Sequence, residues 1–170
     1  MVESRRTKLE NSDLDSVDWA IIGILQVDAT VPNKEIAARV GVAASTCLER
    51  VRRLRESRVI SSISARVDPA RIGRHEQALL GIQIRPHSRE TAGDFVRRVL
   101  EMPETMTVYN VSGTEDYLVH VAVRDSTALQ SLILDRLLAM PQVAHCRTQL
   151  ILGEPLTSSV RQVAGSTESH

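Results

Sequence analysis

The stretch NKEIAARVGVAASTCLERVRRLRESRVI, residues 33–60, contains two helical patterns separated by one glycine. The first pattern covers residues 34–40, and we expect Gly41 to end it by adopting a left-handed backbone. The second covers about residues 44–56, and its apolar side chains recur at i, i+4 and i+7, on one face: Cys47, Val51 and Leu54. Two short helices joined by a tight glycine turn predict a helix-turn-helix.

A further helical pattern precedes this stretch. We expect it to begin near Asp13 or Asp15, because either side chain can cap a helix, and its apolar residues recur at helical spacing over residues 17–25. After the last helix, residues 59–69 alternate and are rich in Val, Ile and Ser, which favours a short strand or wing. The sequence therefore predicts a winged helix-turn-helix domain over residues 13–62.

The third helix is rich in arginine, which allows two interpretations. From Arg50 to Arg74 the chain carries eight arginines against two acidic residues, although the net charge of the 170 residues is zero. A solvated face, paired with Glu49 and Glu56, would explain the arginines of an isolated helix. In a helix-turn-helix, the same helix is expected to lie in the major groove of double-stranded DNA.

Residues near the N-terminus of the third helix are the candidates for contacts with base edges. Leu48 can press on a thymine methyl group, and Glu49 can accept a hydrogen bond from cytosine. Arg52 and Arg53 are expected to hold phosphates, whereas Arg50 is open between a DNA contact and an inward role that braces the domain. The predicted DNA-binding residues are Ala44, Ser45, Thr46, Leu48, Glu49, Arg50, Arg52 and Arg53.

The second half of the chain has the order β-α-β-β-α-β, which is that of the ferredoxin-like unit. Its helices are predicted over residues 88–102 and 126–140, and its strands over residues 77–85, 105–112, 116–124 and 143–152. The strands carry apolar residues on both faces, whereas two helices cover only one face of such a sheet. A second copy of the chain is the simplest cover for the other face, so we expect a homodimer.

The order of these segments resembles the Lrp/AsnC family, the feast/famine transcription regulators, over about residues 13–152. LDSVDWAIIGIL resembles the opening helix of the family, NKEIAARVGV and CLERVRRL its DNA-reading pair, and ARVDPARIG its linker. VSGTEDYLVHV resembles the glycine-and-aspartate turn of its effector module, and VAHCRTQLIL its closing strand. The resemblance implies dimers that often assemble into tetramers or octamers, partly palindromic DNA sites and, in many members, an amino acid sensed between dimers.

Three positions depart from the family pattern. Ala43 stands where the recognition helix usually opens with a serine cap, and Thr30 stands where an arginine commonly follows the first helix. Arg58 replaces the glycine that usually precedes the dipeptide Val-Ile. These changes concern the details of DNA contact rather than the fold.

The turn VSGTEDY, residues 111–117, has a structural and a functional interpretation. As a hairpin turn it uses Gly113 for a positive backbone angle. Its match to the effector turn of the family implies a small-molecule site, in which free backbone N–H groups hold a carboxylate and Asp116 pairs with an amino group. The predicted effector-binding residues are Ser112, Gly113, Thr114, Asp116 and Thr148.

Other site classes find little support in the sequence. Cys47 and Cys146 are far apart and the histidines are scattered, so neither a disulfide nor a metal site is predicted. Phosphate-loop, nucleophile-elbow and zinc-protease motifs are absent, so we expect no catalytic residues and no cofactor. No apolar run reaches membrane-spanning length and no signal region is seen, which favours a cytoplasmic protein without a membrane partner.

Taken together, the sequence predicts an α+β protein with an N-terminal winged helix-turn-helix joined by a linker to a ferredoxin-like βαββαβ domain for effector binding and dimerisation. The predicted function is a sequence-specific transcriptional regulator that responds to a small effector, an amino acid being favoured. A sirohaem-decarboxylase-like enzyme and an effector-independent DNA-organising protein are the alternatives. The predicted segments are a disordered tail over residues 1–12, the DNA-binding domain over 13–62, a linker strand and hinge over 63–75, the effector and oligomerisation domain over 76–152 and a mobile tail over 153–170.

Overall fold

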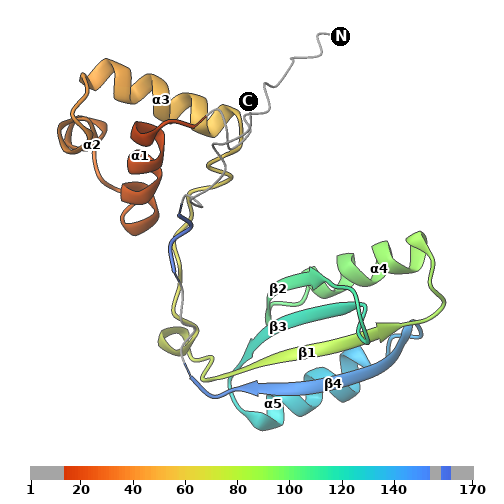
Figure 1. Cartoon of the computed structure of the whole chain (residues 1–170). Coiled ribbons are helices and arrows are strands. Elements are labelled where there is room, and N and C mark those ends of the chain that lie inside the picture. The colour runs from red at the N-terminus through yellow and green to blue at the C-terminus, as the bar shows by residue number, and fades with distance from the viewer. Residues whose placement is uncertain (1–13, 154–157, 162–170) are drawn as a thin grey trace. The chain divides into compact units, whose positions relative to one another are not determined.

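The computed structural model describes residues 14–153 and 158–161 (Figure 1). These residues form two compact units, and the division falls between Ala65 and Arg66. The first unit also includes residues 158–161. Most of the two predicted tails, namely residues 1–12, 154–157 and 162–170, lies outside the described residues.

Three helices make up the first unit: α1 (Ser16–Val27), α2 (Asn33–Val40) and α3 (Ala44–Glu56). Asp15 caps α1, because its Oδ1 accepts a hydrogen bond from the N–H of Asp18 at 2.8 Å. Gly41 ends α2 with φ 73°, as its position in the sequence predicted. The helices enclose a small apolar core whose fully buried members include Ile21, Ile36, Cys47 and Leu54.

The strand or wing predicted over residues 59–69 does not form as a strand. Residues 61–68 are exposed and have no regular secondary structure, and a short 3-10 helix, η2 (Pro69–Ile72), follows them. The alternating pattern favoured a strand, but a strand is stable only when its backbone groups find a hydrogen-bonding neighbour. Within the described residues the sheet contains only strands that begin after residue 75.

The second unit has the predicted β-α-β-β-α-β order. Its elements are β1 (Glu76–Ile84), α4 (Arg89–Leu100), β2 (Thr105–Asn110), β3 (Tyr117–Val123), α5 (Ser126–Ser131) with its π-helical continuation η3 (Leu132–Leu137), and β4 (Val143–Ile151). The strands form an antiparallel sheet in the order β2-β3-β1-β4. This is the ferredoxin-like arrangement that the sequence predicted.

The helices α4 and α5 cover one face of this sheet (Figure 1). Leu80 and Val119, paired across β1 and β3, point into that core and are fully buried. Leu79 and His120, the next pair in the register, point to the opposite face and are only partly buried. Neither α4 nor α5 covers this opposite face, which we call the open face.

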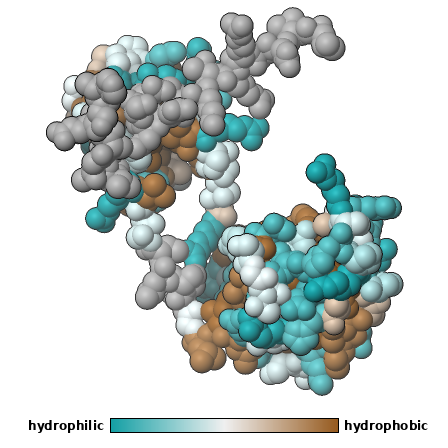
Figure 2. Space-filling model, turned by 45° about the vertical axis from the view of Figure 1, so that its right-hand side comes forward, coloured by the Kyte–Doolittle hydropathy of each residue, from teal (hydrophilic) through white to brown (hydrophobic). Residues whose placement is uncertain are grey.

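Large apolar side chains also remain exposed on the second unit, where Figure 2 shows hydrophobic residues at the surface in brown. They include Leu100, Tyr109, Leu134, Leu138 and Leu150. None of the helices in the described part of the chain is long and apolar enough to cross a membrane.

Residues 158–161 contact α1, although the sequence predicted a mobile tail there. The N–H of Val160 donates to Oε1 of Gln26 at 2.8 Å, and Nε2 of Gln26 donates to the carbonyl of Val160 at 3.0 Å. A side-chain amide carries an NH₂ donor and a carbonyl acceptor side by side, so it can bond to both the N–H and the carbonyl of one residue. This part of the C-terminal segment therefore belongs with the helical unit.

Candidate nucleic-acid interface and effector turn

The helix α3 has one buried and one exposed face. Cys47, Val51 and Leu54 lie in the core, whereas Leu48 is 55% exposed. Because residues at i, i+4 and i+7 share a helix face, Leu48 lies in line with Arg52 and Arg55. The three residues predicted at the N-terminal turn, Ala44, Ser45 and Thr46, are also exposed. The structure thus brings most of the predicted DNA-binding residues to one solvent-accessible side of the helix.

The N-terminus of α3 has no side-chain cap. Ala43 occupies the cap position and has no side-chain acceptor, although its carbonyl accepts a hydrogen bond from the N–H of Cys47 at 3.0 Å. An uncapped first turn leaves backbone N–H groups free to donate to an external acceptor. On a helix that enters DNA, such donors favour a phosphate.

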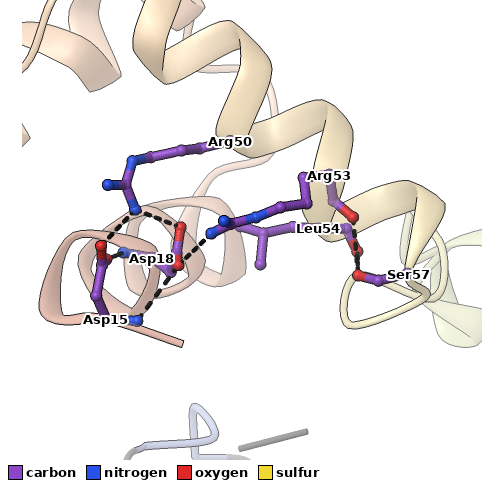
Figure 3. A network of polar contacts seen from close by, with 6 residues as sticks. All are labelled: Asp15, Asp18, Arg50, Arg53, Leu54 and Ser57. Carbon is purple, nitrogen blue, oxygen red and sulfur yellow. Dashed lines mark hydrogen bonds and ion pairs between the residues drawn. The ribbon is translucent and has the colours of Figure 1, made fainter. Parts of the chain in front are cut away.

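Two of the arginines on α3 are held by a buried carboxylate on α1 (Figure 3). Asp18 is fully buried, and its Oδ1 accepts from Nη1 of Arg50 at 3.0 Å while its Oδ2 accepts from Nη2 of Arg53 at 2.5 Å. Arg50 also donates to Oδ2 of Asp15 at 2.7 Å. The hydrogen bond from the N–H of Asp18 and the neighbouring Arg50 guanidinium lower the pKa of Asp15 below its ordinary value.

Of the two arrangements that the sequence left open for Arg50, the structure has the inward one, in which its guanidinium pairs with Asp15 and Asp18. Arg53, predicted as a phosphate contact, is engaged in the same way, although 45% of its side chain remains exposed. Sequence reasoning did not single out Asp18. Its position three residues after the capping Asp15 is the spacing of a capping box, which offered a local signal.

The remaining arginines of α3 are exposed. Arg52 lies 3.5 Å from Glu49 and 3.4 Å from Glu56, in ion pairs on the helix surface. Exposed pairs of this kind contribute little and exchange readily with other partners. Arg55 has no carboxylate within ion-pair distance in the part of the chain that the structure describes. Arg52 and Arg55 are therefore the helix arginines whose guanidinium groups are most available to DNA.

The predicted effector turn is anchored to the end of β1. Oδ2 of Asp116 accepts from the N–H of Ile84 at 2.8 Å, and the guanidinium of Arg85 lies 3.6 Å from the same oxygen. Nδ1 of His87 lies 3.6 Å from Oδ1 of Asp116. The Asp116 side chain is 26% exposed, so it remains within reach of a ligand. Arg85 and His87 were not predicted as part of this site.

The other predicted residues of the turn differ in their placement. Ser112, Gly113 and Thr114 are exposed, and Gly113 has φ 128°, which suits glycine. Thr148 is not beside the turn in the same chain, because it pairs with Leu80 of β1, which in turn pairs with Val119 inside β3. One strand thus separates Thr148 from the strand that the turn precedes.

A different residue of β4 reaches the turn. Arg147 pairs with Glu115 across the open face. The two partners meet over Gly81, where an added Cβ would lie only 2.7 Å from Cγ of Glu115. A glycine inside a strand often marks such a close approach, so Gly81 was a local signal that another group lies against this part of β1, although it did not identify Glu115 and Arg147.

Comparisons with known proteins agree with this architecture. The AsnC-type helix-turn-helix domain matches residues 14–55, and the Lrp/AsnC ligand binding domain matches residues 77–160. The HTH-type transcriptional regulator AldR of Mycolicibacterium smegmatis is 37% identical over 139 residues, which are 82% of this chain and 81% of that protein. The leucine-responsive regulatory protein of Escherichia coli (strain K12) is 32% identical over 154 residues, or 91% and 93% of the two chains.

Solved structures show the same relationship. A transcriptional regulator of Neisseria meningitidis in complex with L-Met superimposes with a TM-score of 0.80 at 28% identity, over 86% of this chain and 96% of that one. These relatives are transcriptional regulators and not enzymes, which sets aside the decarboxylase alternative. The chain belongs to the Lrp/AsnC family of transcriptional regulators, with a DNA-binding and a ligand-binding domain.

Proposed function

We propose that this protein binds specific double-stranded DNA sites as a homodimer and that a small effector, an amino acid, controls this binding. The observation that carries the DNA-binding part is the exposed face of α3, where Leu48 is 55% exposed while the opposite face is packed in the core. A large apolar side chain exposed at the N-terminal half of such a helix suits a thymine methyl group. The relatives are bacterial regulators, and bacterial DNA lies in the cytoplasm, so we propose that this protein acts in the cytoplasm.

We propose that different residues of α3 contact the bases and the phosphates of the DNA. Leu48 and Glu49 read base edges, with help from the exposed first turn of α3. Arg52 exchanges its surface carboxylates for a phosphate. Arg50 and Arg53 act mainly through Asp18, which orients the helix.

The first experiment is fluorescence anisotropy of the protein on the duplex upstream of its own gene, against a scrambled duplex, across a salt series. Leu48→Ala is expected to reduce the preference for the upstream duplex without a loss of stability, because Leu48 is exposed. Leu134→Ala is the matched control, since Leu134 is 52% exposed on the other unit. Equal binding of both duplexes by the unaltered protein would favour the DNA-organising alternative instead.

Dimerisation is proposed to use the open face of the sheet. Half-buried apolar side chains such as Leu79 and Leu118 lie there, with His120 hydrogen-bonded to Oε1 of Gln77 at 3.0 Å. Analytical ultracentrifugation tests this directly. Leu118→Glu should give monomers, whereas Leu100→Glu on the exposed side of α4 should leave the dimer intact. Larger assemblies, tetramers or octamers, would appear in the same measurement.

The effector is proposed to bind at the turn over residues 112–116. An amino acid carries a carboxylate and an ammonium group, and the turn combines exposed backbone N–H groups with the Asp116 carboxylate and the Arg85 guanidinium. The relative of known structure that binds L-Met supports an amino acid as the ligand class. Thr148 can join this site only from a neighbouring copy of the chain.

Isothermal calorimetry with single amino acids tests the effector. Asp116→Asn keeps an oxygen acceptor for the Ile84 N–H but removes the charge that would pair with the ammonium group. We expect it to abolish amino-acid binding while the fold persists. Asp135→Asn, on the distant helical segment η3, serves as the control. If none of the amino acids binds to the unaltered protein, the proposed control by an amino acid fails.

A further inference from the structure

Arg58 has a backbone conformation that arginine rarely adopts. It is the second residue after α3, with φ 63°, and it is the only non-glycine residue with positive φ among the residues that the structure describes. Its N–H donates to the carbonyl of Arg55 at 3.0 Å, and the N–H of Ile60 closes the same turn on the carbonyl of Leu54 at 2.9 Å. Glycine would occupy this position without strain. The fold alone therefore does not explain an arginine here.

The side chain of Arg58 is exposed and has no carboxylate partner among the residues that the structure describes. Arg55, one turn earlier, is also exposed and also has no carboxylate partner among the described residues. Of the other arginines of α3, Arg50 and Arg53 are held by the buried Asp18, and Arg52 forms exposed ion pairs with Glu49 and Glu56. Positive charge without a partner is thus concentrated at the C-terminal end of α3.

The length of α3 determines what this end meets. Its 13 residues span about 20 Å at about 1.5 Å per residue, whereas the major groove is about 12 Å wide. A helix that presents its N-terminal turns to base edges therefore extends past the groove at its C-terminal end, where phosphates lie. Strained residues that the fold does not need are typical of functional sites.

We infer that Arg58, supported by Arg55, contacts the DNA phosphate backbone beside the groove that α3 enters. This inference rests on the proposed DNA-binding function. It assigns a backbone contact to a residue beyond the recognition helix, in addition to the phosphate contact proposed for Arg52, and it gives this role to Arg58 in place of Arg53, which Asp18 holds. The contact is independent of base sequence, so it adds affinity for all duplexes to a similar extent.

The test uses Arg58→Gly in the full chain. We expect this variant to unfold at a higher denaturant concentration, because glycine adopts the left-handed backbone without strain. We expect it at the same time to bind DNA more weakly, with the slope of log K against log salt reduced by about 0.9 for each phosphate contact that is lost. Since stability and affinity change in opposite directions, partial unfolding cannot produce this result.

Three comparisons complete the design. Arg58→Lys should retain most of the salt slope, because it keeps the charge, and Arg55→Ala should reduce the slope as Arg58→Gly does. Arg97→Ala on α4, an exposed arginine of the other unit, should leave it unchanged. If the unaltered protein binds the upstream duplex with a salt slope that Arg58→Gly does not change, the inference fails while the proposed function stands. If the unaltered protein does not bind duplex DNA, the proposed function itself fails.

Discussion

Asp18 on α1 accepts a hydrogen bond from Arg53 on α3 across 2.5 Å, and the two residues are 35 positions apart in the chain. The carboxylate is fully buried, so its charge depends on this arginine and on Arg50 for compensation. Because both arginines come from α3, one buried side chain joins α1 to α3 at two positions. The same residue also completes the capping box of α1.

The first prediction concerns the stability that this carboxylate provides. Asp18→Asn keeps the shape of the side chain but leaves Arg53 without its charge partner and Arg50 with Asp15 alone. We expect the free energy of unfolding to fall by about 2–3 kcal/mol, which is less than for a fully enclosed pair because Arg53 is partly exposed. Urea unfolding measures this change.

Glu35→Ala is the matched control for Asp18→Asn. Glu35 pairs with Arg39 on α2, and both side chains are 52% exposed, so the loss should stay below about 0.5 kcal/mol. A similar small loss for Asp18→Asn would show that α3 does not depend on the buried carboxylate.

Two glycines predict opposite effects of the same substitution. Gly23 lies inside α1 and an added Cβ would meet no atom within 4 Å, so Gly23→Ala should stabilise the protein by about 0.5–1 kcal/mol. Gly41 also has free space, but its φ is 73°, so Gly41→Ala should destabilise by about 1 kcal/mol. The midpoints of thermal unfolding of the two variants test this prediction. Midpoints that shift in the same direction would contradict it.

His120 predicts a dependence of stability on pH. Burial lowers its pKa below the ordinary value of 6.5, so the unfolded chain binds a proton more readily than the folded protein does. The stability that neutral His120 contributes is fully present above pH 6.5. It is lost as the pH falls through 6.5 toward the lower pKa of His120 in the folded protein. We therefore expect urea midpoints to stay level from about pH 8 to about pH 7 and to decline below about pH 6.5.

Substitution isolates the histidine responsible. His120→Gln should make the decline of the urea midpoint with falling pH shallower. His145→Gln, on the exposed part of β4, should leave the decline as it is. An unchanged pH dependence in His120→Gln would assign the effect to other groups.

The contact between Gln26 and Val160 predicts a local effect on the C-terminal segment. Gln26→Ala removes both hydrogen bonds to the backbone of Val160. Because one exposed hydrogen bond contributes modestly, we expect the Val160 amide to exchange with solvent about 2–10-fold faster. Amide exchange by NMR measures this rate, with Gln130→Ala on α5 as the control. Equal exchange rates in both variants would mean that the segment is not held by Gln26.

Much of the fold was predictable because its signals are local. The glycine turn at Gly41, the apolar face of residues 44–56 and the β-α-β-β-α-β order all follow from periodicity and turn residues within short windows. The strand that the alternation favoured within residues 59–69 did not form, for the complementary reason. Its alternation was local, but a strand also needs a neighbouring strand, and local sequence does not specify one.

The sequence by itself determined the helices, the strands and the family, since each depends on residues close together in the chain. Only the tertiary structure decided which arginines are free to meet DNA, because Asp18 reaches α3 from 35 residues away and engages Arg53 and, with it, Arg50. It also decided that Arg147, rather than Thr148, meets the effector turn, because the register of β4 against β1 sets which side chain faces Glu115. Long-range pairing of charges depends on packing geometry, and no local pattern in the sequence contains that geometry.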